Sequence, residues 1–400
     1  MSQPKYAYRS LIAAALAIAG LASHPASARD NDRERDDDER GECALSFSTV
    51  GDSRQDPVAP DSTTLPLYGQ DSIWLQSTKA WSRIERSITE QKSDILFFNG
   101  DMIMGYGNNV LPANNTTLAG ILGSDLVLAY KQYAFWRGMV AGMMETGTYV
   151  VPVPGNHEVQ WKAGGKKAQV ANENAWRANM GDLIMDDRRF SGILGEAPAN
   201  ESVGDSRNVF DGLTSDQSKL SFSFDFKGSH FAVVNTDPVG KDSHAPTNWL
   251  AADLYAARAR GAKHFFVFGH KPAFTYYYGS VIPTPPATPL PGSPSGLDAD
   301  LPARDAFWDV IELYSATYFC GHEHIFNMMQ PRGKAWQVMV GSGGSPFEAK
   351  PGTPTIGTTD RTYAWAKVDV KENDKVVIRA YGFDEKFGPT RLLKTVKLPR

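Results

Sequence analysis

The sequence predicts an α/β protein built as a four-layer α-β-β-α sandwich, in which two mixed sheets stack face to face and helices flank them. Three observations lead to this fold class. Strand-like apolar runs alternate with helix-like segments, the C-terminal part is rich in predicted strands, and five of the strand-like runs stop at a glycine followed by polar side chains. With 400 residues, 42% of them hydrophobic, the chain can bury a core of this size.

The N-terminal 42 residues precede the predicted domain. Residues 1–28 combine a weakly basic start, an apolar run from Leu11 to Leu21 and the small residues Ala26-Ser27-Ala28, which is the order of a Sec-type signal peptide cleaved after Ala28. An anchor left in place is the alternative. Residues 29–42 carry four arginines against eight acidic residues, as is typical of a charged, disordered linker. We therefore expect a secreted or periplasmic protein with no membrane span after cleavage.

The predicted single domain, residues 43–400, starts with a β-α-β unit. One strand is expected at 44–50 and another at 94–99, and between them Ser72 is a candidate N-cap for a helix over 72–92. Two strands joined by a helix should lie parallel in one sheet, with a right-handed crossover.

A second helix and a third strand follow. The helix is expected at 125–146 and the strand at 149–154, where apolar β-branched residues dominate. Segments 102–123 and 162–219 lack a regular pattern, apart from a helix predicted over 172–180.

The next part of the chain is predicted to begin the other sheet. An alternating strand at 220–226 and an apolar strand at 230–235 indicate a hairpin. A helix at 247–260 then leads to a strand at 265–268. The segment 276–302 follows, and the proline-rich run 282–294 within it favours an extended polyproline conformation and cannot pack as helix or strand.

The last predicted elements are a helix at 303–314, a strand at 317–320 and a β-rich C-terminal end over 335–398. Each of the three irregular insertions named above follows a strand that ends in a polar motif. We expect the insertions to surround the edge where these motifs lie, because loops at such edges set specificity.

Polar side chains that can bind metal follow five of the predicted strands. The carboxyl ends of parallel strands meet at a crevice, so these side chains should converge there. Carboxylate, amide and imidazole donors together suit Mn, Fe or Zn. Two such ions about 3.5–4 Å apart can hold a hydroxide that attacks a phosphate ester. In chain order the motifs are Gly51-Asp52, Gly100-Asp101, Gly155-Asn156-His157-Glu158, Gly269-His270 and Gly321-His322-Glu323-His324.

The order of these motifs resembles that of the calcineurin-like metallophosphoesterase superfamily, nearest to its secreted, purple-acid-phosphatase-like branch. The resemblance covers roughly residues 45–344. It implies a dinuclear centre in which a hydroxide bridging the two ions attacks the phosphorus. The ligands it implies are Asp101 as the bridge, Asp52 and His324 for the first ion, and Asn156, His270 and His322 for the second.

The resemblance also implies residues that act on the substrate. His157 would not bind metal but would hydrogen-bond the phosphate or protonate the leaving group, and Asn156 would lie beside it at the substrate. Arg54 is a departure, because Asp-x-His is common where this chain has Asp52-Ser53-Arg54. The guanidinium of Arg54 could bind a phosphate oxygen and stabilise transition-state charge, or it could pair with a carboxylate.

Two other positions bear on the predicted site. Met104 stands where purple acid phosphatases have a tyrosine ligand, so we expect a weaker first ion and no coloured iron-tyrosinate centre. Tyr276 lies shortly after His270 and is a candidate for stacking on an aromatic leaving group, with packing of its loop as the alternative.

These features predict a phosphoric ester hydrolase (EC 3.1 class) that acts on a small phosphate ester, with a phosphomonoesterase favoured. A phosphodiesterase or nucleotide hydrolase of the same fold is one alternative, and a non-catalytic metal- or phosphate-binding protein is the other. The formal net charge of −4 is concentrated in the N-terminal linker, and no basic stripe indicates a grip on nucleic acid.

The chain has only two cysteines, Cys43 and Cys320, which fall at opposite ends of their predicted strands. At about 3.3 Å per residue their sulfur atoms should be too far apart for a disulfide. We expect two free and largely buried thiols.

Overall fold

The computed structural model describes residues 42–57, 73–111, 117–202, 204, 211–276, 295–348 and 361–398. The predicted signal peptide, nearly all of the charged linker and most of the proline-rich segment lie outside the described residues, and so does the candidate cap Ser72. Among the residues that are described, no helix has both the length and the apolar character needed to cross a bilayer.

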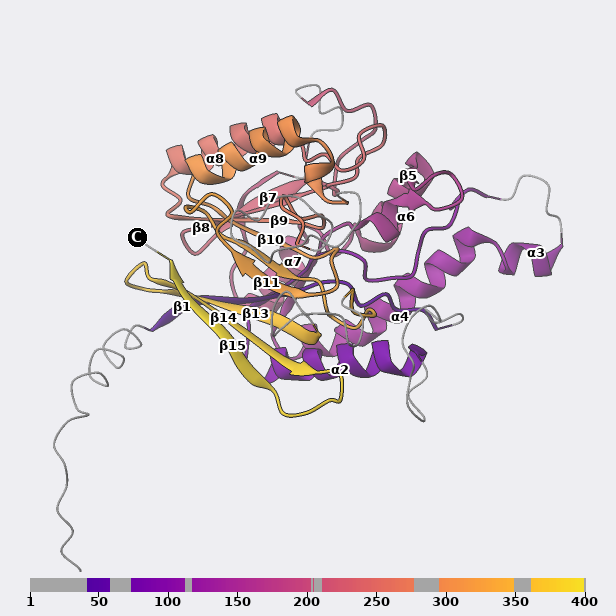
Figure 1. Cartoon of the computed structure of the whole chain (residues 1–400), viewed down its shortest axis with the longest axis horizontal. Coiled ribbons are helices and arrows are strands. Elements are labelled where there is room, and N and C mark those ends of the chain that lie inside the picture. Colours follow the sequence, from indigo (N-terminus) through magenta and orange to yellow (C-terminus); the bar gives the residue numbers. More distant parts are fainter. Residues whose placement is uncertain are drawn as a thin grey trace, which may run out of the picture. The chain divides into compact units, whose positions relative to one another are not determined.

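The first sheet carries the β-α-β unit that the sequence predicts. Strand β1 runs parallel to β2 and β2 parallel to β3, whereas the C-terminal strand β13 pairs with β1 in antiparallel orientation. Helices α2 (Ile73–Glu90) and α4 (Asp125–Glu145) pack on this sheet, α2 against β13 and α4 against β3 (Figure 1). The strand order is β15 (Arg391–Leu398), β14 (Val376–Asp384), β13 (Thr362–Lys371), β1 (Cys43–Val50), β2 (Ile95–Phe98) and β3 (Tyr149–Pro152).

The second sheet contains the predicted hairpin and the later strands. Strands β8, β9, β10 and β12 are parallel neighbours, and the other pairs are antiparallel. Helices α8 (Thr247–Arg260) and α9 (Leu301–Leu313) lie side by side over it (Figure 1), with α8 against β8. The strand order is β11 (Phe326–Met329), β12 (Gln337–Val340), β10 (Thr317–Cys320), β9 (His264–Gly269), β8 (Ser229–Val234), β7 (Phe222–Phe226) and β6 (Ala199–Ser202).

Aromatic side chains join the inner faces of the two sheets. The ring of Phe47 on β1 meets those of Phe266 and Phe268 on β9 edge-on, with centroids 4.9 and 5.8 Å away. The ring of Phe97 on β2 stacks on Phe268 at 3.8 Å. Edge-on and stacked pairs of this kind each contribute about 0.5–1.5 kcal/mol beyond the burial of their area. The contacts confirm the predicted four-layer arrangement, with two mixed sheets facing each other and helices outside.

The irregular insertions hold more structure than the sequence pattern predicts. Helix α6 (Val170–Met180) was expected, but α7 (Asp187–Leu194) and the small β4–β5 sheet (Gln160–Trp161 and Lys167–Ala168) were not. Local capping explains α7, because the side chain of Asp186 accepts a hydrogen bond from Arg189 N. The segment 102–123 likewise contains α3 (Leu118–Leu122), capped by Thr117.

Both cysteines are free, which confirms the prediction that they form no disulfide. Cys320 is buried at the end of β10, as expected. The expected burial of Cys43 is wrong, because Cys43 opens β1 at the end of the strand far from the site and is exposed there.

A buried histidine in the second sheet makes stability depend on pH. His230 has no exposed surface, and its two ring nitrogens lie 2.6 Å from Asp225 Oδ1 and 2.9 Å from Asp253 Oδ2. Burial alone would lower the pKa of His230, but the bonds to the two carboxylates outweigh burial and raise it above its ordinary value. The protonated ring therefore stabilises the fold below pH of about 6.5, and this stability is lost as the pH rises through the raised pKa.

We expect His230→Gln to cost about 3–5 kcal/mol of unfolding free energy near pH 6 and to cost less near pH 9. The reason is that it removes the cation that joins Asp253 to Asp225 and leaves Asp225 paired with Arg260. Urea unfolding at both pH values, with chelator present, measures the difference. His264→Gln is the matched control. Burial lowers the pKa of His264, so the cost of that change should instead grow as the pH rises. A pH-independent cost for His230→Gln would contradict the prediction.

Candidate metal centre

The carboxyl ends of five strands bring the predicted ligands to one edge of the sandwich. Strands β1, β2 and β3 of the first sheet and β9 and β10 of the second all end there. Backbone bonds join the two sheets at this edge, since Gly51 N donates to Val340 O and Gly343 N donates to Gly51 O, both at 2.9 Å. The distance between the two halves of the site is therefore fixed by main-chain contacts.

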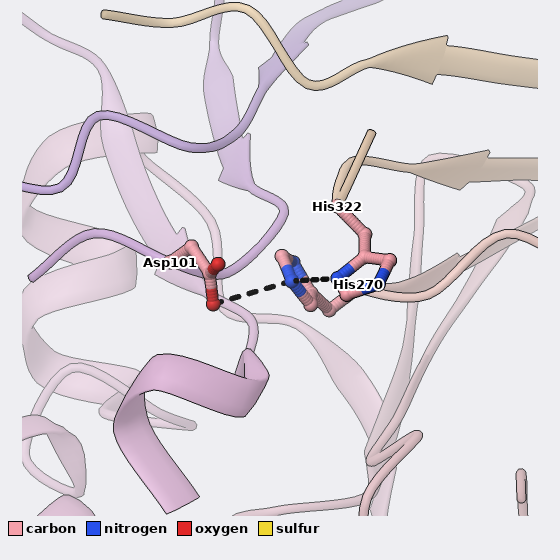
Figure 2. Close-up of side chains that lie close together, drawn as sticks. All are labelled: Asp101, His270 and His322. Carbon is pink, nitrogen blue, oxygen red and sulfur yellow. Dashed lines mark hydrogen bonds and ion pairs between the residues drawn. The ribbon is translucent and has the colours of Figure 1, made fainter. Parts of the chain in front are cut away.

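The ligands predicted for the second ion converge. One ligand atom from each of Asp101, His270 and His322 lies within 4.8 Å of the other two, and Figure 2 shows the three side chains pointing toward one another. Asp101 Oδ1 is 3.2 Å from His270 Nε2, and His322 Nδ1 is 3.2 Å from the same nitrogen. Asn156 Oδ1 joins them, at 2.8 Å from His270 Nε2 and 2.9 Å from His322 Nδ1.

The protonation of His270 explains why this cluster suits a cation. Its Nδ1–H donates to Asn99 O at 2.7 Å, so Nε2 of the neutral ring presents a lone pair to the oxygen atoms of Asp101 and Asn156. A backbone carbonyl that fixes a ring in this way is the usual support of a metal-binding histidine. Without an ion, burial is outweighed by Asp101 and Asp52, which raise the pKa of His270 to about 9. The proton on Nε2 then supplies the positive charge that a metal ion would otherwise supply.

The ligands predicted for the first ion face the same space. His324 donates Nδ1–H to Pro346 O at 2.6 Å, and its Nε2 lies 3.6 Å from Asp52 Oδ1. Asp52 Oδ1, His324 Nε2 and Asp101 Oδ2 are buried and have no hydrogen-bond partner among the described residues. Orphaned acceptors of this kind are costly unless a cation satisfies them. The donor set therefore fits a second ion, held by fewer protein atoms.

Arg54 lies next to this half of the site. One guanidinium nitrogen is 3.7 Å from Asp101 Oδ2, and the side chain is 19% exposed. The structure thus brings Arg54 to the site, beside the carboxylate rather than at the position of a metal ligand. At the position where Asp-x-His would place a histidine, this chain has the positively charged side chain of Arg54.

His157 also faces Asp101 without belonging to the ligand cluster. Its Nδ1–H donates to Met104 O at 2.6 Å, and its Nε2 lies 3.6 Å from Asp101 Oδ2. Burial, together with the charge of Arg54, lowers the pKa of His157 to about 3. The ring is therefore neutral, and Nε2 is an acceptor.

Sequence reasoning gave no role to Glu158, although it belongs to the third motif. Its buried carboxylate accepts hydrogen bonds from Asp101 N at 2.9 Å, Gly155 N at 2.8 Å and Ile103 N at 3.2 Å. Burial and the charge of Asp101 raise the pKa of Glu158 to about 7. Glu158 fixes the loop after β2 against the start of α5 (Asn156–Val159), and so holds Asp101 and Asn156 in register.

Three residues at the site have a left-handed backbone conformation, which is unfavourable for residues other than glycine. Asp52, Asp101 and His322 have φ values of 62°, 52° and 72°, in the left-handed region. Each costs about 1–2 kcal/mol relative to a right-handed residue, as is typical of functional sites. Gly100 is required beside them, because its φ is 81° and a Cβ there would lie 2.5 Å from His270 Nδ1.

Tyr276 is partly buried and packs against the apolar cluster between the second sheet and its helices. Its N–H donates to the buried carboxylate of Glu323, 2.5 Å away. These contacts favour the packing alternative. Tyr106, which the sequence analysis did not single out, does contact the site, since its hydroxyl accepts a hydrogen bond from Asn156 Nδ2.

Comparison with known proteins supports the fold. No family model matches the sequence. No curated protein matches it either. Among solved structures, a purple acid phosphatase from yellow lupin aligns at a TM-score of 0.52 with 13% identity over 88% of this chain, which spans 53% of the lupin chain. A dimetal phosphatase from Danio rerio aligns at 0.50 with 11% identity, over 89% of this chain and 99% of the other. The architecture is the metallophosphoesterase fold that the motif order predicts.

Adding Mn²⁺ or Zn²⁺ to the chelator-treated protein should raise its Tm. An ion that binds only the folded chain stabilises it by about 2.7 kcal/mol at a hundred times its Kd. His322→Ala should lose most of the increase, because it removes one of the convergent acceptors. Differential scanning calorimetry measures both.

The control for this prediction is His264→Ala. His264 stands on β9, at the opposite end of the strand from His270, so the variant should keep the full metal-dependent increase even if its own Tm is lower. An equal increase in His322→Ala and in the wild type would remove His322 from the centre.

Proposed function

We propose that this chain, which has the metallophosphoesterase fold, is a metal-dependent phosphohydrolase whose preferred substrates are small phosphate monoesters. The observation that carries the proposal is the convergence of buried acceptors from both sheets on one space at the strand ends. Two solved structures with the same fold are a purple acid phosphatase and a dimetal phosphatase, which supports the same reaction class for this chain. The signal-like N-terminus supports export as part of the proposal.

The protein residues would hold two ions in unequal sites. Asn156, His270 and His322 would serve one ion, Asp52 and His324 the other, and Asp101 both, one carboxylate oxygen facing each half. Bound ions would polarise the phosphoryl oxygen and lower the pKa of the attacking water. Their identity is proposed only as Mn, Fe or Zn, from the mixed oxygen and nitrogen donors.

His157 would handle the proton of the substrate. Its one proton lies on Nδ1, toward Met104 O, so Nε2 faces the site and can accept a hydrogen bond from the acidic hydrogen of a monoanionic phosphate ester. As the bond from phosphorus to the leaving oxygen breaks, this proton, held in place by His157, would transfer to that oxygen. A phosphodiester carries no such proton, so the arrangement favours monoesters over diesters.

Arg54 would supply positive charge at the first ion's site, where the absence of a histidine ligand leaves the ion less tightly held. A guanidinium that lies 3.7 Å from Asp101 Oδ2 and is partly open to solvent can donate to a phosphate oxygen. We therefore place Arg54 among the groups that bind substrate and stabilise the transition state.

The protein should hydrolyse p-nitrophenyl phosphate faster than bis-p-nitrophenyl phosphate, with the activity removed by chelator and restored by Mn²⁺, Zn²⁺ or Fe²⁺. Asp101→Ala and His322→Ala should each lower kcat by about a hundredfold or more, since each removes convergent ligand atoms. Steady-state kinetics with each metal gives the answer. A wild type inactive on both esters under every metal, yet still binding metal, would favour the non-catalytic alternative.

Arg54→Ala should lower kcat/KM by at least about tenfold, because a charge-assisted bond contributes about 1.5–3 kcal/mol. Metal content, measured by mass spectrometry of the purified variant, should stay at the wild-type level. Arg83→Ala is the control, because Arg83 donates to the carbonyls of Phe387 and Gly388 in the connection between β14 and β15, and its loss should leave the kinetics unchanged. Unchanged kinetics in Arg54→Ala would exclude Arg54 from the site.

A further inference from the structure

The loop after Asp101 wraps around His157. Met104 O accepts a bond from the His157 ring, and Tyr106 N–H donates to His157 O at 2.9 Å. Between them, Gly105 has a φ of 45°, and a Cβ there would lie 1.8 Å from His157 O, so only glycine allows the turn. The ring of Tyr106 lies against that of His157, with centroids 3.8 Å apart. This turn places Tyr106 beside the metal-facing atoms.

The hydroxyl of Tyr106 is left with a proton to donate. Its oxygen accepts a bond from Asn156 Nδ2, the other end of the amide whose Oδ1 faces His270 and His322. A tyrosine hydroxyl has one proton to give, and no acceptor for it lies within hydrogen-bond distance in the described part of the chain. Tyr106 is partly exposed, whereas Asn156 and His157 are buried. Tyr106 therefore lies nearer to solvent than the two residues that it contacts.

We propose that Tyr106 binds the substrate, by donating its hydroxyl proton in a hydrogen bond to a non-bridging oxygen of the phosphate. The inference rests on the proposed function and adds a residue to it. The side-chain amide of Asn156 has its oxygen toward the histidines and its nitrogen toward the Tyr106 hydroxyl. A phosphate bound beside this amide would therefore have an oxygen close to the hydroxyl. Phosphate oxygens accept strong hydrogen bonds. Forming this bond would need little reorganisation of the protein, because the turn at Gly105 already fixes the tyrosine ring against His157.

A purely structural role is the competing explanation. The ring and the backbone of Tyr106 support His157, and the hydroxyl orients Asn156. Tyr106→Phe separates the two roles, because it keeps the ring and the backbone contacts and removes only the hydroxyl. An effect on phosphate binding at saturating metal then reports contact with the ligand, and an effect on metal affinity reports action through Asn156.

The test uses the full chain loaded with Mn²⁺, and inorganic phosphate as the probe. For Tyr106→Phe we expect the Kd for phosphate, from titration calorimetry, to rise about tenfold, and kcat/KM for p-nitrophenyl phosphate to fall about 10- to 100-fold. Metal content and the affinity for Mn²⁺ should not change. Tyr149→Phe is the control, since the Tyr149 hydroxyl donates to Leu183 O at 2.7 Å in the core and its loss should alter Tm only.

Three results would overturn the inference. These are wild-type phosphate affinity in Tyr106→Phe, a weakened affinity for Mn²⁺ that accounts for the whole effect, and no phosphate binding by the metal-loaded wild type. The proposed function fails separately, if the wild type hydrolyses no ester. In that case the phosphate titrations still decide whether Tyr106 contacts the ligand.

Discussion

The packing of the two sheets through Phe47 and Phe97 is the constraint on which the site depends. Each sheet by itself delivers only part of the set of proposed ligands, because Asp52, Asp101 and Asn156 follow strands of the first sheet and the three histidines follow strands of the second. Ring contacts with the facing strand β9, at 4.9 and 3.8 Å, set the separation of the layers. Backbone bonds from Gly51 to the region after β12 then lock the edges together. The core thereby decides how far Asp101 lies from His270 and His322.

Electrostatic balance follows from this close approach. Asp52 and Asp101 are wholly buried within one space, and burial with the neighbouring charge of Asp101 raises the pKa of Asp52 well above its ordinary value. Burial lowers the pKa of His322 and of His324, so both rings are neutral and offer lone pairs. Without ions, the raised pKa values of His270 and Asp52 favour protons on these two groups, so the binding of ions there is coupled to the release of protons.

The sequence was sufficient to predict the fold and the convergence of Asp101, His270 and His322, because each of these residues follows a glycine at the end of a buried strand. It was insufficient to predict the residues that contact the site from another loop. Tyr106 and Glu158 owe their positions to contacts between the β2 and β3 loops, and no periodicity in the sequence reports such contacts. The predicted burial of Cys43 was wrong because the first residue of a strand can extend past the neighbouring elements that bury the rest of the strand. Helix α7 was not predicted because its N-cap, Asp186, is of a residue type that is also common in loops.

The left-handed backbone at Asp52, Asp101 and His322 has a consequence for evolution in the laboratory. These residues hold conformations that glycine would adopt at lower cost, so replacing any of them with glycine relieves backbone strain while deleting a side chain of the proposed metal centre. A screen that rewards heat resistance alone would favour such replacements at the expense of the proposed centre. Metal binding must be selected in parallel if thermotolerant descendants of this protein are to keep it.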